Sequence, residues 1–333
     1  MEIILIIPII IAFFITLFFT FIWIKKAKQI GLIWEDMHKP KHPKNVAGSG
    51  GLGVVFGFVL GTLIYIAIKT FILKTDIVTV EIFALLTTIL LVGFIGLMDD
   101  LLGWRRGGLS KRSRLALILF AAIPLVVINA GESKMMGINL GLLYPLFFVP
   151  LGIVGASVTF NFLAGYNGLE TSQGILILSA LAIATWFTGN SWLSLIAIIM
   201  ISCLLAFYLF NKYPAKIFPG DILTYSVGAM IASLAILGDM EKIAIFFFIP
   251  YIIETGLKLR GKLKKQSFGK LNADCSLELP YNKFYGLEHV SIYLLKKIKK
   301  DKKVYEKEVV YLINLFQIFI IILGLILFRG NIF

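Results

Sequence analysis

Charged side chains are scarce in this chain of 333 residues: Asp, Glu, Lys and Arg make up 15%. Ordinary soluble domains carry about 25% charged residues. Apolar residues account for 59% of the chain, and the mean hydropathy is +0.91. So few polar groups cannot cover the surface of a soluble domain. The composition therefore excludes a soluble enzyme and a disordered protein, and it predicts a polytopic membrane protein.

Cysteine and histidine are scarce as well. Cys203 lies in an apolar run and Cys275 in a basic loop, which excludes a disulfide framework and argues against a cysteine-type zinc site. The three histidines, His38, His42 and His289, have no metal-ligand spacing. We expect them at the protein surface.

Long apolar runs are what the chain does contain. A membrane helix needs roughly 20 mostly apolar residues to cross the hydrocarbon core of a bilayer. Candidate spans cover residues 3–24, 52–68, 82–98, 115–130, 145–164, 174–188, 191–210, 222–238, 243–258 and 309–328. We therefore expect an all-α fold of about ten transmembrane helices, forming a single integral-membrane catalytic domain over residues 1–333.

The distribution of positive charge predicts the topology. If the chain crosses the membrane at each span, the loops on one side are 25–51, 99–114, 165–173, 211–221 and 259–308. With Lys258 at the edge of the last loop, that side holds 27 of the 32 Lys and Arg residues. Because cytoplasmic loops are enriched in Lys and Arg, we expect both termini outside and the first span to be a retained anchor. The net charge of +13 is thus a gradient toward one face and does not indicate nucleic-acid binding.

Polar residues collect at the inner ends of the spans. They are Asp99 and Asp100 in IGLMDDLLGW, Asn161, Asn167 and Glu170 in FNFLAGYNGLE, and Asp221 after Pro219-Gly220. Three separate stretches thus bring carboxylates and carboxamides to the face that also holds most of the cations, as expected for a site.

The acidic residues could also have purely structural roles instead of functional ones. Asp99 and Asp100 at the end of span three would oppose the helix dipole, by about 0.3–1 kcal/mol each, unless Arg105 and Arg106 neutralise them. Asp221 opens a helix and could serve as its N-cap.

Other polar residues have similar alternatives. Asn161 and Asn167 could be turn residues, and Glu170 could simply favour a helix dipole. Glu254, near the inner end of span nine, is either a functional group at membrane depth or a side chain that reaches the interface.

This set of residues favours one kind of chemistry. Oxygen ligands without a Cys/His cluster indicate Mg²⁺, with Mn²⁺ as the alternative, bound through one or two carboxylates plus phosphates. Arg and Lys around such a site suit a polyphosphate. A basic inner face could also hold anionic membrane lipids without any reaction. A lipid-linked phosphoryl transfer would use both properties.

Three stretches in this order resemble the polyprenyl-phosphate N-acetylhexosamine-1-phosphate transferases: IGLMDDLLG, FNFLAGYNGLE and the FPGD element at 218–221. That superfamily includes the cell-wall phospho-N-acetylmuramoyl-pentapeptide translocase and the dolichyl-phosphate N-acetylglucosamine phosphotransferase. EDMHKPKHPKNVAGSGGLG, residues 35–53, looks like the first cytoplasmic loop of the family. The resemblance implies a ten-helix fold with a cytoplasmic cleft, located in the cell membrane, or in the endoplasmic reticulum membrane of a eukaryote.

The resemblance also implies a reaction. A UDP-sugar, UDP-N-acetylglucosamine first of all, donates sugar-1-phosphate to a dolichyl-type polyprenyl phosphate and releases UMP. By similarity, Asn161 and Asp221 would hold Mg²⁺, and Asp99 and Asp100 would lie by the lipid phosphate, with Asp99 as the usual candidate for a base. The other implied substrate-binding residues are Asn167, Gly165 and Phe218 at the uridine, Glu170, Lys265, and either Lys111 or Arg112 at phosphate. Because the acceptor phosphate is mostly dianionic at neutral pH, we expect Asp99 and Asp100 to serve positioning more than proton removal.

Two departures from the family bear on the substrate. FGKLNADCSLELPYNKF resembles the eukaryotic branch, but Lys265, Gln266 and Ser267 stand where that branch has an Arg-His-Arg triplet. No histidine lies between His42 and His289, unlike in the cell-wall branch. The alternatives are another UDP-N-acetylhexosamine with undecaprenyl phosphate and, more distantly, a transporter of phosphorylated solutes. The sequence leaves a homodimer open.

Overall fold

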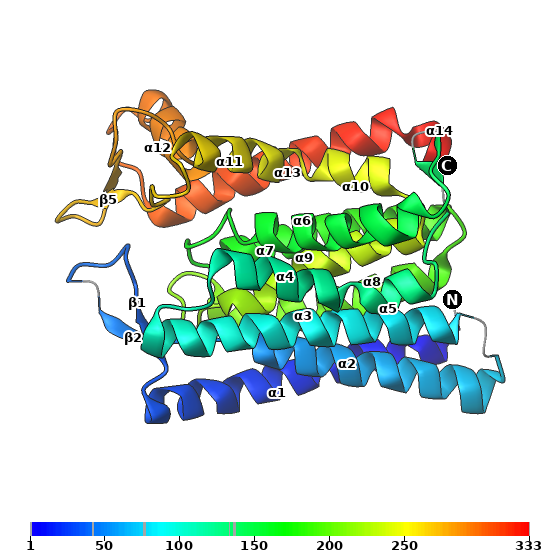
Figure 1. The fold of residues 1–333 in the computed structure, drawn as a ribbon. Coiled ribbons are helices and arrows are strands. Elements are labelled where there is room, and N and C mark those ends of the chain that lie inside the picture. Colours follow the sequence, from blue (N-terminus) through cyan, green and yellow to red (C-terminus); the bar gives the residue numbers. More distant parts are fainter. Residues whose placement is uncertain (1, 42, 76–77, 133, 136–137, 333) are drawn as a thin grey trace.

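The computed structural model describes residues 2–41, 43–75, 78–132, 134–135 and 138–332, and these residues are mostly helical. Long helices run side by side through the molecule, whereas the strands are short and lie at the ends of the helices (Figure 1). The long helices are α1 (Ile6–Ile30), α2 (Gly51–Ala67), α3 (Thr79–Arg106), α7 (Leu169–Phe187), α8 (Ser191–Asn211), α9 (Gly220–Leu237) and α13 (Glu306–Leu327).

Seven helical stretches of the described residues are long and apolar enough to cross a membrane, as in a multi-pass membrane protein. Each contains one of the long helices; α1 is extended by η1 (Ile3–Leu5) and α2 by the π-helical η2 (Ile68–Leu73).

Three further apolar stretches are each divided into two helical pieces. They are α4 (Lys111–Ala121) with α5 (Ile123–Val127), the π-helical η3 (Tyr144–Phe148) with α6 (Val149–Phe160), and α10 (Glu241–Phe247) with α11 (Ile249–Arg260). Pro124, Pro150 and Pro250 each lie in the first turn of the second piece. Proline removes a backbone donor and clashes with the preceding turn, which explains the breaks.

The remaining elements lie outside these helices. They are the antiparallel pairs β1 (Ile33–Glu35) with β2 (Lys44–Ala47), β3 (Lys134–Met135) with β4 (Ile138–Asn139) and β5 (Lys270–Leu271) with β6 (Leu277–Glu278), together with α12 (Leu287–Ile298) and α14 (Arg329–Ile332). The start of α1 and the end of α13 lie at one end of the bundle, and β1, β2, β5 and α12 lie at the other (Figure 1).

One boundary differs from expectation in a way that affects the site. The sequence places Asp99 and Asp100 at the end of a helix, but α3 continues to Arg106 and ends where Gly107 adopts φ +88°. The two aspartates therefore lie inside the helix, and the expected conflict with the helix dipole does not arise, since that effect is confined to the last turn.

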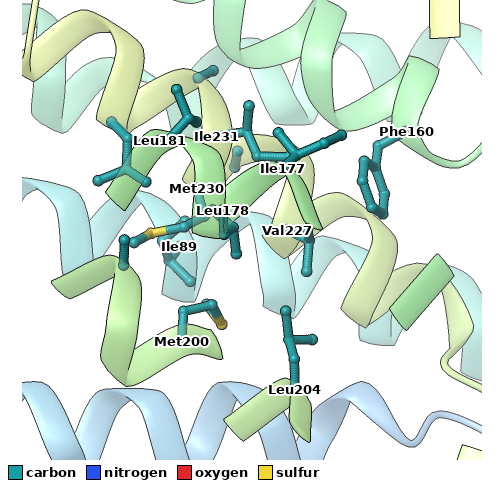
Figure 2. Packing of buried hydrophobic residues seen from close by; sticks show 14 of the residues in the cluster. Ile89, Phe160, Ile177, Leu178, Leu181, Met200, Leu204, Val227, Met230 and Ile231 are labelled. Carbon is teal, nitrogen blue, oxygen red and sulfur yellow. The ribbon is translucent and has the colours of Figure 1, made fainter. Parts of the chain in front are cut away.

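Helix α9 is the centre of the bundle. It packs against α2, α3, α6, α7 and α10, and its residues from Ile222 to Ile236 are all buried. Figure 2 shows Val227, Met230 and Ile231 of α9 among apolar side chains of α3, α6, α7 and α8. The start of α9, which carries Asp221, is thus held rigidly by its neighbours.

Two glycines allow other helices to approach α9 closely. A Cβ atom at Gly96 of α3 would lie 2.6 Å from the backbone oxygen of Asp221 and from Cα of Ile222. A Cβ atom at Gly228 of α9 would lie 2.5 Å from the backbone oxygen of Ala156 on α6. Because the Gly96 contact lies one turn before Asp99 and Asp100, it brings both aspartates to the start of α9.

The segment between α1 and α2, residues 31–50, which we call the first inner loop after its expected position, joins this arrangement through its backbone. Strands β1 and β2 pair with Ile33 opposite Ala47. Ala47 then accepts a hydrogen bond from Phe218 N at 2.8 Å and donates one to Lys216 O at 3.3 Å. The segment before α9 is therefore fixed to the hairpin as well as to α3.

We predict that Gly96→Ala lowers the stability of the protein, because the new methyl group meets the α9 backbone, which cannot move aside as a side chain can. Overpacking of this kind costs about 1–3 kcal/mol. The measurement is thermal unfolding of the purified protein in detergent. Gly155→Ala in α6 is the matched control, because a Cβ atom there meets nothing within 4 Å; equal unfolding temperatures for both variants would contradict the prediction.

Candidate active site

A cavity of about 400 Å³ opens at the end of the bundle that carries β1 and β2. Eight of the residues singled out in the sequence line it: Asp99, Asp100, Asn161, Gly165, Asn167, Glu170, Phe218 and Asp221. Residues from α3, α4, α9, the first inner loop and the 161–170 segment thus meet in one place. Lys111, Arg112 and Lys265 are not among the lining residues.

Asp221 is at the centre of the acidic end of this cavity. Its Oδ1 accepts a hydrogen bond from Asn161 Nδ2 at 3.0 Å, and its Oδ2 lies 3.1 Å from the hydroxyl of Tyr225. Its backbone N donates to Asp100 Oδ1 at 2.7 Å. Thr224 orients the same carboxamide by donating to Asn161 Oδ1 at 3.0 Å. Helix α9 begins at Gly220 without a side-chain cap, so the N-cap interpretation of Asp221 is wrong.

Asp99 uses both of its oxygens in contacts with the protein. Oδ1 accepts from the backbone N of Leu109 at 2.8 Å, and Oδ2 lies 3.2 Å from the Tyr225 hydroxyl. Arg114 Nε lies 2.6 Å from the same Oδ2, and its Nη2 lies 4.0 Å from Asp221 Oδ2. Asp99 is therefore a fixed carboxylate, held between α3, α4 and α9.

Arg114 is the cation that sequence reasoning missed. Lys111 and Arg112, the two expected phosphate contacts, are exposed on the first turn of α4. Arg114 lies at the next helical position toward the bundle and shares a face with the buried residues Ile118 and Ala121. That spacing of three to four residues is the signal that could have selected it. The alternative that Arg105 and Arg106 neutralise the aspartate pair does not hold for Arg105, whose guanidinium stacks on the Trp104 ring; the side chain of Arg106 lies outside the described part of the chain.

The acidic end offers oxygen ligands of the kind that Mg²⁺ takes, and substrate and water would supply the remaining ligands of such an ion. Asp100 Oδ2 is buried and accepts no well-formed hydrogen bond from the described residues, although Ser49 and the backbone of Ile222 lie beside this carboxylate. It lies close to Gly220, where a Cβ atom would be 2.1 Å away. No group of three or more His, Cys, Asp or Glu residues in the described part of the chain has the arrangement of a full protein-only metal site. Mg²⁺ does not need one, since it is commonly bound through one or two carboxylates plus phosphates.

The other end of the cavity is built from backbone, amide and aromatic groups. Gly165 has φ +102°, and a Cβ atom there would lie 2.8 Å from the ring of Phe268. The backbone N of Gly165 donates to Glu170 Oε1 at 2.8 Å. Glu170 is buried and fixes this turn, so it does more than favour a helix dipole. Phe268, from the 259–308 segment, is a lining residue that the sequence did not reveal.

The histidine expectation is wrong for two of the three residues. His38 is 4% exposed and His289 is fully buried, whereas His42 lies outside the described residues. The His38 ring packs on Tyr166, with a centroid distance of 4.2 Å, because the first inner loop folds into the cleft. Burial, together with the nearby Lys258, lowers the pKa of His289 to about 4, so this residue is neutral at pH 7.

A buried polar cluster supports the segment that carries Phe268. Tyr166 Oη accepts a hydrogen bond from Gly269 N at 3.1 Å, and Lys258 bonds the Ser267 hydroxyl. Lys258 also lies 3.4 Å from Glu254 Oε1. Glu254 is completely buried and accepts from the backbone N of Leu287 at 2.6 Å, so it joins α11 to α12 rather than reaching the interface.

The chain resembles known proteins over most of its length. The family model for glycosyl transferase family 4 matches residues 82–239. A protein of Saccharolobus solfataricus is 38% identical over 275 residues, covering 80% of this chain and 81% of that protein. The chain belongs to this glycosyl transferase family. The Saccharolobus relative carries the provisional name UDP-N-acetylglucosamine–dolichyl-phosphate N-acetylglucosaminephosphotransferase.

Other relatives are also similar to this chain over most of their length. A Sulfolobus acidocaldarius protein with the same provisional name is 34% identical, covering 79% of this chain and 80% of its own length. The phospho-N-acetylmuramoyl-pentapeptide-transferase of Streptococcus pyogenes serotype M6 is 29% identical over 71% of this chain and 72% of its own. The resemblance inferred from the motifs is therefore confirmed, and the chain is a transferase of this family.

We predict that Arg114→Gln lowers transferase turnover by about 10²-fold or more, the scale on which losing one charged group at a transition state acts. Removal of the guanidinium leaves Asp99 and Asp221 facing each other without their cation. The measurement is the initial rate of the purified protein with saturating substrates. Arg112→Gln is the matched control on the exposed side of the same helix, and an equal loss in both variants would contradict a specific role for Arg114.

Proposed function

We propose that this protein transfers N-acetylglucosamine-1-phosphate from UDP-N-acetylglucosamine to a dolichyl-type polyprenyl phosphate and releases UMP. The observation that carries the proposal is that all three family motifs line one cavity, in a chain 38% identical to a relative with that name. The product would be the first lipid-linked sugar of an oligosaccharide.

The proposed topology has ten spans and both termini outside, with the cavity facing the cytoplasm. The seven long helices and the three divided stretches of the described residues would together supply these ten crossings. The start of α1 and the end of α13 lie at one end of the bundle, opposite the Lys-rich 259–308 segment, which supports this orientation (Figure 1).

The acceptor lipid has a candidate path along the bundle. An apolar groove of about 420 Å³ lies between η3, α6, α9, α10 and α11. It reaches Thr159, two residues before Asn161, and is otherwise lined mainly by aliphatic and aromatic side chains. Such a groove suits a polyprenyl chain, whose phosphate would then lie at the acidic end of the cavity.

Asp221 and Asn161 would hold the Mg²⁺, with Asp100 alongside. When bound, the ion would neutralise the pyrophosphate of the donor and polarise its phosphorus–oxygen bonds. The protein itself contributes the fixed orientation of these oxygens, through Tyr225, Thr224 and the backbone N of Asp221.

The reaction is a direct displacement at phosphorus. An oxygen of the polyprenyl phosphate attacks the phosphorus that carries the sugar, the bond to the bridging oxygen breaks, and UMP leaves with that oxygen. No proton has to be removed first, because a phosphate monoester with a second pKa near 6 is mostly dianionic at pH 7. Since both oxygens of Asp99 are engaged by Leu109, Tyr225 and Arg114, this carboxylate is better suited to positioning than to nucleophilic attack.

The metal-site assignment predicts that Asp221→Ala and Asn161→Ala abolish turnover, because each removes an oxygen that would hold the ion. The assay combines purified protein, Mg²⁺, a polyprenyl phosphate and a panel of UDP-sugars, and it measures released UMP. Asp301→Ala, at an exposed aspartate of the inner segment, is the control. Near-normal activity of either site variant would remove that residue from the metal site, and absence of UMP with every donor would overturn the proposed function.

The positioning role of Asp99 predicts a particular pH dependence. Asp99→Asn keeps an acceptor for Leu109 N but loses the charge that faces Arg114, so the rate should fall by a similar factor at every pH between about 7 and 9, where the acceptor phosphate is mostly dianionic. The measurement is a full pH–rate profile of variant and wild type. Recovery of the variant to wild-type rates at high pH would instead identify Asp99 as a base.

A further inference from the structure

A second buried polar cluster lies at the far end of the cavity from the aspartates, and no step above uses it. We call Asp36, His38, Asn167 and Glu306 the amide cluster. Their side chains come from the first inner loop, the 161–168 segment and the start of α13, and each residue is at most 5% exposed. Of the four, Asp36 and Asn167 line the cavity.

The cluster determines which way the Asn167 amide faces. Its Nδ2 donates to Asp36 Oδ2 at 3.3 Å and to Glu306 Oε2 at 3.3 Å. Its backbone N donates to Glu306 Oε1 at 2.7 Å, which fixes the residue at a second point. Turning the amide over would set its carbonyl oxygen against two carboxylates, leaving buried acceptors unpaired. The nitrogen therefore stays on the carboxylate side and the carbonyl oxygen on the opposite side.

The two carboxylates are themselves held in place. Asp36 is paired with Lys39, and its Oδ1 accepts from the backbone N of His38 at 3.3 Å. His38 Nδ1 lies 3.5 Å from Glu306 Oε1, and its ring is packed between Tyr166 and Phe268. The amide thus has a preset orientation before any ligand enters, as an effective recognition group requires.

A fixed carbonyl oxygen accepts hydrogen bonds and cannot donate them. Uracil presents an N–H at ring position 3, whereas cytosine presents a bare acceptor nitrogen there. We propose that Glu306 and Asp36 are positioning residues that make this site prefer uracil over cytosine, by holding the Asn167 carbonyl toward the base. The proposal rests on the proposed use of a UDP-sugar and extends it to the residues that select the base.

The test compares UMP and CMP binding to the intact purified protein by titration calorimetry. Wild type should bind UMP more tightly by about tenfold to a hundredfold, the range expected when one buried hydrogen bond is made or left unmade. In Glu306→Gln the new carboxamide can donate to the Asn167 oxygen, so the amide can turn over and the UMP/CMP ratio should fall toward one. Glu308→Gln removes a charge from the same helical turn without a contact to Asn167 and should keep the wild-type ratio.

A second variant and a kinetic measurement separate positioning from loss of fold. Asp36→Asn, like Glu306→Gln, leaves one of the two carboxylates on the amide, so its UMP/CMP ratio should also fall below that of wild type. With UDP-N-acetylglucosamine, both variants should raise KM by a larger factor than they lower kcat, because the base is remote from the reacting phosphorus. An unchanged UMP/CMP ratio in a folded Glu306→Gln protein that still releases UMP would overturn this inference and leave the proposed function standing. A wild type that binds neither nucleotide would overturn both.

Discussion

The close contact between α3 and α9 is the constraint on which the site depends. At Gly96 the two backbones approach so nearly that no side chain fits between them, and one turn later Asp99 and Asp100 meet the start of α9. Asp221 then becomes the third carboxylate in a partly buried space. Carboxylates gathered in this way are unfavourable unless cations and donors compensate them. Arg114, Tyr225 and Asn161 supply part of that compensation, and a divalent ion with its phosphates would supply the rest.

Most of the fold could be predicted from the sequence, because burial in a membrane leaves a strong record in hydropathy. Among the described residues, the apolar runs locate the seven helices that are long enough to cross a membrane and the three divided stretches. Hydropathy does not locate helix ends well. An apolar run ends at the first charged residue, whereas the backbone hydrogen bonds of the helix can continue beyond it. Asp99 and Asp100 are the example: the apolar run stops before them, but α3 ends only at Gly107, whose positive φ terminates it.

The site residues that lie within one sequence motif could be predicted. Those that reach the site only through the folding of distant segments could not. FNFLAGYNGLE and FPGD place Asn161, Asn167 and Asp221 on the cavity wall. The choice between Lys111 and Arg112 missed Arg114, because selecting a cation on a helix requires knowing which face is buried. Glu306 lies 139 residues from its partner Asn167, and no local pattern connects two such positions.

In the proposed reaction the two ends of the cavity would hold one donor molecule, so the end that holds the base would also influence the reaction at phosphorus. The β1–β2 hairpin bonds the segment before α9 through Ala47 and Phe218, and it leads directly into Asp36 of the amide cluster. If the amide holds the base in one orientation, the pyrophosphate would lie in a defined position relative to Asp221. Little further conformational entropy would then be lost when the reacting groups align. Binding energy gained at the nucleoside is in this way used to align the reacting phosphorus, which is how contacts far from a reacting bond can accelerate it.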